Sequence, residues 1–533
     1  MKYYWRNSIL MVLLIANLSS CSDNKSKSST RNSLNIDIAG DVTTFDPQAM
    51  IDAYTFRVLS DMYEGLVDMD QANRPIPGMA EKWTVSPDGK TYIFNLRHDL
   101  KFSDGSPLTA HDFVYSWQRL ASPKTAGYKF VIDHLSNAES VFAGKLPIDK
   151  LGITALDNYT LKVTLASPDP AFIAKCTTIF TSAVPQKIIA QYGESWALPQ
   201  HVVSTGAYRL TKHIANGTIQ MHKNDYFYDG NHVKIDNLNF IPYADRNAAL
   251  AAYKTGDIDI SANVPIDQYQ QLKTQYPQEL HTVKMEGITF YSLNTRIGKL
   301  QNKDLRQALS MVIDRDVLVN KILANGQTAL YSYISASIEQ NRYGNLNYDW
   351  QQLSYPERIK IAQQLYAKAG YNHNHPLELD LLYDNNDASR KVAIAIANMW
   401  ESGLGVKTNL HSQEWKGYLA ARKNGNFEVI RNSWGAAFNF ITTYTPEYQC
   451  KSSVNVSDYC NNEYDNLITQ ADKEQNPHLQ TKLYQQAIKL AMKEYAVIPL
   501  YQNSYTTLIK PYVHGLDIES NLLEDIRSKW ISF

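Results

Sequence analysis

Stretches with strand periodicity alternate with stretches with helix periodicity along the chain, and this alternation limits the possible fold more than any other feature. The clearest example begins with the turn sequence Ser-Pro-Asp-Gly at 86–89, whose residues favour tight turns. Apolar side chains then alternate over 92–96, as in a half-buried strand. Thr109 follows as a helix N-cap, with Asp112 at the third helical position in a near capping box.

The remaining segments give the same mixture without an internal repeat. Predicted strands lie at 34–38, 160–165, 377–383, 406–410 and 427–431. Predicted helices lie at 109–117, 186–193, 303–323, 356–370, 391–400 and 480–493. The 533 residues suffice for roughly two to four domains. Mixed strands and helices over this length predict an α/β fold in several lobes.

The charges nearly cancel, which removes one class of partner. The chain has 52 Lys and Arg against 53 Asp and Glu, a formal net charge of −1. Proteins that bind nucleic acid usually carry a basic patch or a high isoelectric point, so we predict no nucleic-acid partner. The aromatic share of 11% suits a large core, and it also suits a cleft for peptides or sugars.

The first 20 residues have the features of an export signal. Lys2 and Arg6 give a positive start, and residues 9–18 form an apolar run that is too short to span a bilayer. Small residues then precede Cys21, in an arrangement that resembles a bacterial lipobox. We therefore predict a signal peptide at 1–20, lipidation of Cys21 and a Ser-rich flexible tether over 21–33. The alternative is an ordinary cleaved signal whose cysteine is incidental.

Export to an oxidising compartment favours a disulfide between two of the three remaining cysteines. Cys450 and Cys460 bracket a polar, loop-like stretch, and we predict that they are bonded to each other. Cys176 lies in an apolar context and is predicted to be a buried free thiol. His373 and His375 are the nearest approach to a ligand pair, but a solvated loop explains them better, so no metal or other cofactor is predicted.

The sequence contains no nucleophile elbow, no phosphate-binding loop and no HExxH zinc motif. We therefore expect a binding protein rather than an enzyme. A secreted enzyme such as a peptidase is the alternative from a different class, and a sensor or chaperone-like adhesin on the same scaffold is another.

Several segments, in order, resemble the bacterial extracellular solute-binding proteins of the oligopeptide and dipeptide class. The longest is MAEKWTVSPDGKTYIFNLRHDLKFSDGSPLTAHDFVYSW at 79–117. The others lie at 43–48, 63–66, 204–210, 255–260, 304–316, 413–415 and 510–515. The resemblance covers essentially all of the chain after the tether.

This resemblance implies a type II-like periplasmic binding protein fold with three lobes. Lobe I is expected at 34–63, 187–286 and 505–533, lobe II at 64–186 and lobe III at 287–504. The ligand is expected between lobes I and III, which close by hinge motion. A peptide ligand would add as a strand, held mostly through its main chain. The implied partners are the transmembrane subunits of an ABC permease, at the periplasmic face of a bacterial membrane, and the protein is expected to be a monomer.

The segment 431–439 matches the family segment beside which the ligand pairs. Arg431, Trp434 and Asn439 match, whereas the aspartate that clamps the ligand's α-ammonium is replaced by Ala437. The family's cleft cysteine pair is replaced on both sides, at Gly287 and Gly435. The ligand-binding residues that the resemblance predicts are Tyr128, Asp384, Trp415, Arg422, Arg431, Trp434, Gly435, Ala436, Ala437, Phe438 and Asn439.

Because the clamp is replaced, the resemblance predicts the fold but leaves the identity of the ligand open. Arg422 and Arg431 match basic residues of the family, while its histidine falls on Ser389 and a lysine on Leu323. An arginine left without an acidic neighbour would favour a ligand anion, since burying it unpaired costs several kcal/mol. The ligand alternatives are thus an oligopeptide, a murein peptide, an N-blocked peptide or a non-peptide anion. The two arginines could instead form structural ion pairs, and Trp415 and Trp434 could be core aromatics.

We predict that Cys21→Ser abolishes acylation and releases the protein from the membrane fraction, while the fold is unchanged. The physical reason is that Cys21 precedes the first core segment and supplies only the attachment point for the lipid. Membrane fractionation and mass spectrometry of the mature N-terminus check this. A variant that stays acylated and membrane-bound contradicts the lipobox interpretation.

Overall fold

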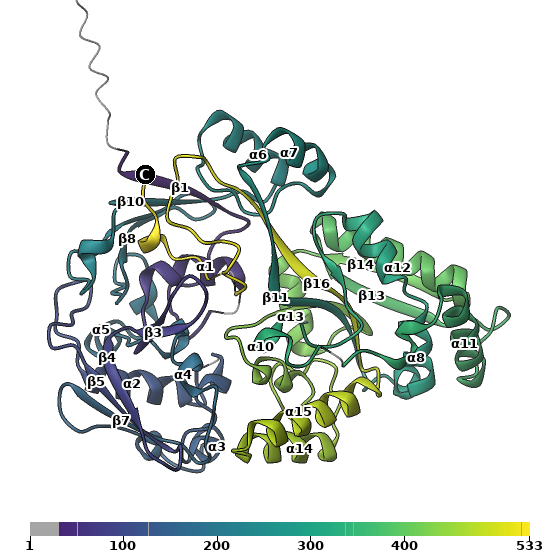
Figure 1. The fold of residues 1–533 in the computed structure, drawn as a ribbon, viewed down its shortest axis with the longest axis horizontal. Coiled ribbons are helices and arrows are strands. Elements are labelled where there is room, and N and C mark those ends of the chain that lie inside the picture. The colour runs from purple at the N-terminus through teal and green to yellow at the C-terminus, as the bar shows by residue number, and fades with distance from the viewer. Residues whose placement is uncertain (1–30, 51, 126, 336, 345, 524) are drawn as a thin grey trace, which may run out of the picture. The chain divides into compact units, whose positions relative to one another are not determined.

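The computed structural model describes residues 31–533, apart from 51, 126, 336, 345 and 524. The predicted signal peptide, Cys21 and most of the tether lie outside the described residues. Ser33–Phe533 forms one compact unit that holds every element named below (Figure 1). Within the described ranges, no helix is long and apolar enough to cross a membrane. We keep the names lobe I, II and III for the ranges predicted above, whose boundaries remain predictions.

Lobe I contains a four-stranded sheet in the order β1-β10-β9-β8. β1 runs parallel to β10, and the other neighbours are antiparallel. Helix α1 (Ala53–Met62) packs against β8. β1 begins at Ser33, the last residue of the predicted tether, because that residue pairs with Asn237. The strands are β1 (Ser33–Ile38), β8 (Tyr208–His213), β9 (Ile219–Lys223) and β10 (Asn237–Pro242).

Lobe II contains a second four-stranded sheet, which confirms the strand predicted at 92–96. The order is β4-β5-β7-β6, all antiparallel. The predicted capping box is present at the start of α2, where Thr109 N and Oγ1 donate to Asp112 Oδ2 at 2.8 and 3.0 Å. The elements are β2 (Val67–Met69), β3 (Pro75–Pro77), β4 (Ala80–Val85), β5 (Thr91–Leu96), β6 (Ile153–Ala155), β7 (Thr160–Thr164), α2 (Ala110–Ala121), α3 (Ala138–Phe142) and α4 (Phe172–Lys175).

A six-stranded mixed sheet, in the order β12-β16-β11-β15-β13-β14, forms the centre of lobe III. β11 is antiparallel to both of its neighbours, whereas β13 is parallel to β14 and β15. The strands predicted at 377–383, 406–410 and 427–431 are thereby confirmed. The strands are β11 (Leu280–Leu293), β12 (Thr328–Ala329), β13 (Glu378–Asp384), β14 (Lys407–Gln413), β15 (Val429–Gly435) and β16 (Val497–Leu508).

Most of the predicted helices are found where the periodicity indicated. The exception is 303–323, which is interrupted because Asp314 caps a new helix by accepting from Val317 N at 3.1 Å. The remaining helices are α5 (Gln186–Tyr192), α6 (Arg246–Thr255), α7 (Tyr269–Gln275), α8 (Lys303–Met311), α9 (Arg315–Val317), α10 (Ile338–Asn341), α11 (Tyr355–Lys368), α12 (Asp387–Leu404), α13 (Trp415–Asn424), α14 (Asn462–Lys473) and α15 (Pro477–Met492).

The two longest strands, β11 and β16, run from lobe I into lobe III (Figure 1). Their ladder pairs 280–284 with 504–508, and it resumes where Ile288 pairs with Gln502. The register shifts between these two halves, as at a β-bulge, where a strand bends locally. The predicted lobe boundary at 286/287 falls on this irregularity, and the boundary at 504/505 lies at its edge, where Ser504 pairs with Lys284.

Charged residues near the C-terminus fasten lobe I to the start of lobe II. Arg527 Nη1 lies 2.5 Å from Asp68 Oδ1, and its Nη2 lies 2.9 Å from Asp525 Oδ2. Lys529 Nζ adds contacts to Glu64 at 2.7 Å and to Asp68 at 2.5 Å. Burial would raise the pKa of Asp68, but the two cations lower it. Because buried ions are tolerated only when paired, this cluster fixes the position of the C-terminal segment.

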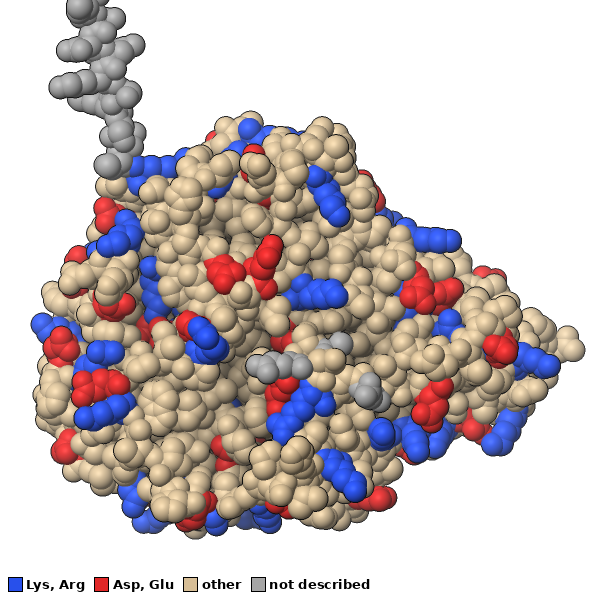
Figure 2. Space-filling model, in the orientation of Figure 1, with Lys and Arg blue, Asp and Glu red and all other residues tan. Residues whose placement is uncertain are grey.

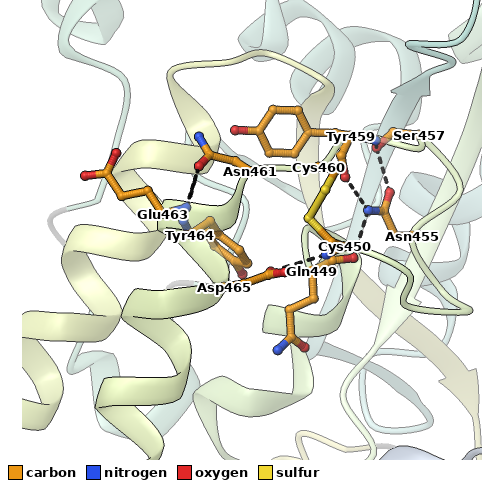
Figure 3. The surroundings of a disulfide bond; sticks show 10 residues. All are labelled: Gln449, Cys450, Asn455, Ser457, Tyr459, Cys460, Asn461, Glu463, Tyr464 and Asp465. Carbon is orange, nitrogen blue, oxygen red and sulfur yellow. Dashed lines mark hydrogen bonds between the residues drawn. A yellow bond between two sulfur atoms is a disulfide. The ribbon is translucent and has the colours of Figure 1, made fainter.

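The predicted disulfide is present between Cys450 and Cys460, just before α14 (Figure 3). Asn455 holds the enclosed loop by donating from Nδ2 to Gln449 O at 3.1 Å and to Tyr459 O at 2.7 Å. Closing so short a loop stabilises the fold by about 2–3 kcal/mol in loop-entropy estimates. Cys176 is a buried free thiol, as predicted, and burial raises its pKa.

Candidate functional site

Basic and acidic side chains are interspersed on the face of the molecule shown in Figure 2. This distribution agrees with the near-zero net charge. The described residues include no group of three or more His, Cys, Asp or Glu side chains placed to hold a metal ion. His375 stacks on Tyr371, with ring centroids 5.8 Å apart.

The last part of β15 has one free edge. Along one side β15 pairs with β11 from Val429 to Gly435. Along the other side β13 pairs only with Val429 and Ile430, so 431–435 has no strand partner there within the described residues. An unpaired strand edge is a template for an added strand. Gly287 and Gly435 face each other in the β11–β15 ladder, so the two positions that replace the family's cysteine pair are structural neighbours.

Arg431, at the start of this free edge, is paired with Asp384. Arg431 Nη1 lies 3.7 Å from Asp384 Oδ1, which also accepts from Ser389 Oγ at 2.8 Å. Burial lowers the pKa of the Arg431 guanidinium, but the charge of Asp384 outweighs this effect and the pKa is raised. The expectation that Arg431 lacks an acidic neighbour is therefore wrong. The two residues are distant in sequence and meet because β13 lies beside β15.

Arg422 differs from Arg431 because its guanidinium has no ion pair. It lies near the end of α13, and its Nε is buried without a hydrogen-bond partner among the described residues. Burial raises the pKa of the Tyr128 hydroxyl in lobe II, and the charge of Arg422 opposes this rise. The charge of Arg422 in lobe III thus acts on the hydroxyl of Tyr128 in lobe II.

The two predicted site tryptophans lie where lobe III meets the other lobes. The Trp415 ring is stacked 5.6 Å from Tyr418 and lies 6.5 Å from Tyr54 of lobe I. The Trp434 ring lies 6.5 Å from Phe130 of lobe II. Both indole Nε1 atoms are buried without hydrogen-bond partners in the described part of the chain. Each tryptophan therefore keeps a free donor at a contact between lobes.

The other predicted residues of the segment 431–439 differ in exposure and in the groups that they leave free for a ligand. Gly435 is exposed, and the half-buried Ala437 supplies only a methyl group. Ala436 is buried, and its N donates to Glu286 O at 2.7 Å. Phe438 is buried, with its ring 6.2 Å from that of Phe130 in lobe II. Asn439 is engaged in a hydrogen bond within lobe III, because its Oδ1 accepts from Glu339 N in α10 at 2.9 Å.

Buried polar atoms without partners concentrate in this part of the molecule. Of the 23 such side-chain atoms among the described residues, 11 belong to the stretch 415–448. Native proteins leave few buried polar groups unpaired, and each one calls for an explanation such as a bound ligand or water. The stretch contains every predicted lobe III site residue except Asp384. The predicted lobe III site residues other than Asp384 therefore lie in the stretch of the described chain that is richest in unpartnered buried polar atoms.

Glu447 and Glu286 belong to the same region, and sequence reasoning missed both. Glu447 is 2% exposed, and Glu286 is 1% exposed beside the irregularity in β11. Both carboxyl oxygens of Glu447 lack hydrogen-bond partners among the described residues. Burial raises the pKa of Glu286, and the nearby hydroxyls of Ser335 and Ser337 oppose this rise. Burial raises the pKa of Glu447 to about 8, although the charge of Arg422 lowers it. No motif surrounds either residue, so nothing in the sequence indicates that these acids are buried.

Comparison with known proteins shows which family this chain belongs to. The family model of bacterial extracellular solute-binding proteins, family 5 Middle, matches residues 74–455. The periplasmic oligopeptide-binding protein OppA of Salmonella typhimurium is 34% identical over 89% of this chain and 88% of its own. The murein peptide-binding protein MppA of Escherichia coli is 33% identical over 91% and 90%. A probable deoxycholate-binding periplasmic protein, YgiS of Escherichia coli, is 33% identical over 90% of each chain.

Solved structures of similar proteins also match this chain, and their TM-scores allow the arrangement of the lobes to be compared. Haemophilus influenzae OppA in complex with the peptide RPPGFSPFR matches with a TM-score of 0.89 at 31% identity, over 94% of this chain and 98% of that one. Escherichia coli MppA matches with a TM-score of 0.90 at 32% identity, over 94% and 98%. An unliganded open form of MppA scores only 0.70 at the same identity, over 94% and 97%. The lobes of this chain are therefore arranged as in the peptide complex.

The buried Glu447 predicts a specific pH dependence of stability. Its pKa is about 8 in the folded protein, against an ordinary value of 4.5. Between these values the unfolded chain has lost a proton that the folded protein keeps. The free energy of unfolding therefore falls as pH rises, by at most about 1.4 kcal/mol per pH unit from this group. Glu447→Gln should remove that contribution, so that the variant gains stability relative to the wild type at pH 8 but not at pH 4.5.

Urea denaturation at pH 4.5 and pH 8 checks this prediction. Glu463→Gln, at an exposed position on α14, is the matched control and should follow the wild type at both pH values. Equal pH dependence in Glu447→Gln and the wild type would show that Glu447 is ionised in the folded protein.

Proposed function

The chain belongs to the bacterial extracellular solute-binding proteins, family 5, and from this premise we propose that it captures oligopeptides or peptide-like ligands for an ABC importer. It has the type II-like periplasmic binding protein fold of its structural neighbours. The ligand lies between lobes I and III, and the closed protein delivers it to the permease in the inner membrane. The protein is a carrier and catalyses no reaction.

The observation that carries this proposal is the free edge of β15. Residues 431–435 have no strand partner on that edge among the described residues, and they lie beside the unpaired Arg422 and the indole of Trp434. Tyr418 already donates to Arg431 O, and Ser433 N donates to Asn432 Oδ1, so an added strand would bond the remaining main-chain groups or displace these side chains. An extended peptide that adds there bonds through its own backbone, which allows its side chains to vary. The arrangement of the chain supports the proposal, because a solved complex that matches it with a TM-score of 0.89 holds a nonapeptide.

The proposed ligand carries an anionic group and has no free amine at the usual place. Arg422 supplies an unpaired cation in the site, whereas Ala437 supplies no charge. Asp384 does not replace the missing clamp, because Arg431 and Ser389 already engage its carboxylate. A desolvated ammonium without a carboxylate partner costs several kcal/mol. We therefore favour N-blocked or acidic peptides, among which murein peptides are one class.

A non-peptide anion is the second candidate ligand. It is favoured by the unpaired Arg422 together with the similarity to a relative described as a probable deoxycholate-binding protein. A rigid bile-acid-like anion would use the arginine and the aromatic walls, but it would leave the free edge of β15 unpaired. The peptide therefore remains the better candidate.

The location of the protein follows from its relatives and from its N-terminus. The two relatives described as peptide-binding proteins are periplasmic. We propose that this chain also acts in the periplasm, as a monomer held at the membrane by a lipid on Cys21. The tether over 21–33 would let the folded part reach the permease.

Matched peptides test the ligand proposal. We expect N-acetylated and acidic tri- to pentapeptides to raise the melting temperature more than the same peptides with free amines. A ligand at about 100 times its dissociation constant adds roughly 2.7 kcal/mol of stability, which thermal shift detects. Ala437→Asp should restore binding of free-amine peptides, and Ala437→Asn is the control of equal size without charge. Arg422→Ala should weaken the acidic peptides.

Two results would contradict the proposal in different ways. Tight binding of unmodified peptides that acetylation abolishes would mean that another acid, Glu286 or Glu447, holds the amine. A response to deoxycholate and to none of the peptides would favour the second candidate.

A further inference from the structure

A cluster of charged residues in lobe II faces lobe III and borders Phe438, one of the predicted ligand residues. Lys175, at the end of α4, is 2% exposed. Its Nζ lies 2.9 Å from Asp169 Oδ2 and 3.3 Å from Asp133 Oδ1. His134 Nδ1 lies 2.7 Å from Asp133 Oδ1 and 3.7 Å from Asp169 Oδ2. Lobe II therefore presents two cationic and two anionic side chains together.

Lobe III contributes one carboxylate to this cluster. Asp472 lies near the end of α14, and its Oδ2 is 3.6 Å from His134 Nε2. Its other oxygen, Oδ1, accepts a 2.6 Å hydrogen bond from the hydroxyl of Tyr484 on α15. This bond orients the carboxylate, so that one oxygen points at the imidazole. Figure 1 shows α14 and α15 near α3 of lobe II and well away from α6 and α7.

The same surface of lobe II also touches the segment that carries the site. The Phe438 ring lies 6.0 Å from Lys175 Nζ, in a cation–π arrangement. Phe130 lies 6.2 Å from Phe438 and 6.5 Å from Trp434. The charged contact and the aromatic contact thus border one interface, and Phe438 belongs to both.

The charges of the cluster make the contact attractive at neutral pH. Burial and Lys175 lower the pKa of His134, but Asp133 and Asp169 raise it further, to about 10. The pKa of Asp133 is about 2, because its cationic neighbours outweigh burial. In the open state the lobe II groups would balance each other, with two positive and two negative charges. Only His134 and Asp472 would exchange their contact for water, so the contact can break and form reversibly.

We propose that the His134–Asp472 pair and the Phe130–Phe438 contact form a latch between lobes II and III that is made when the cleft closes. The His134–Asp472 pair contains none of the predicted ligand-binding residues, so it stabilises the closed state and sets ligand affinity through the closed fraction. Phe438 is one of those residues and connects the latch to the site. The described lobe III segment joins the rest of the chain through β11 and β16, whose ladder is irregular between Lys284 and Ile288. A turn of lobe III at that point would change the distance between α14 and lobe II. The proposal rests on closure as part of the proposed function.

Two observations support a latch over a permanent joint between lobes II and III. A relative at 32% identity occurs in two arrangements, with TM-scores of 0.90 and 0.70 against this chain, and the second is an open form. The pair also lies partly exposed, with 17% of the His134 side chain and 16% of the Asp472 side chain accessible. A ligand that prefers one of two states shifts the population by its differential affinity. A latch also stabilises the closed state relative to the open one.

A double-mutant cycle with Asp472→Asn and His134→Gln tests the latch. Single-molecule energy transfer between dyes at exposed Leu156 of lobe II and Leu479 of lobe III reports the closed fraction without any ligand. We expect each single variant to lower the ratio of closed to open molecules about fivefold, and the double variant to lower it no further. Glu463→Gln, on the same helix without a partner in lobe II, should leave the ratio unchanged. Asp472→Glu should recover part of the loss.

Circular dichroism confirms that each variant is folded. The latch is overturned if Asp472→Asn behaves like Glu463→Gln, or if the lobe II–lobe III distance stays short in every molecule. Peptide binding is measured separately by thermal shift. Loss of the mutational effect with binding intact overturns the latch alone, whereas intact closure without any peptide binding overturns the proposed function alone.

Discussion

The backbone ladder between β11 and β16 is the interaction on which the rest of the structure depends. These strands carry the chain into lobe III and out of it, and they are neighbours in its six-stranded sheet. Their register shift places a flexible point beside the site. β15 depends on the same ladder, because it pairs with β11. The hinge and the free edge that we assign to the ligand are therefore parts of one sheet.

The buried charged residues fall into two groups: those with carboxylate partners, which stabilise the fold, and those without partners, which we assign to the ligand site. Arg527, Lys529 and Arg431 have carboxylate partners within 4 Å, as buried ions require. Arg422 and Glu447 do not have such partners among the described residues. Both belong to the stretch that holds the largest share of unpartnered buried atoms. In this protein paired charges hold the lobes together, whereas Arg422 and Glu447 stay unpaired among the described residues, in the stretch 415–448.

Local features were predictable from the sequence, whereas contacts between distant segments were not. The capping box at Thr109, most helix positions and the disulfide of Cys450 follow from short patterns, and the structure has them. The resemblance predicted the family and the fold. The ion pair of Arg431 with Asp384 was missed because it requires knowing which strands are neighbours. The burial of Glu447 was missed because nothing in its local sequence distinguishes a buried acid from an exposed one.

The central claim is that the closed cleft holds a peptide or peptide-like compound through its main chain. Mass spectrometry of the small molecules released from protein purified without denaturation tests it most directly. The account predicts about one equivalent of a compound that contains peptide bonds, carries an acidic group and has no free α-amine. Release of an equivalent amount of a compound without peptide bonds would contradict it.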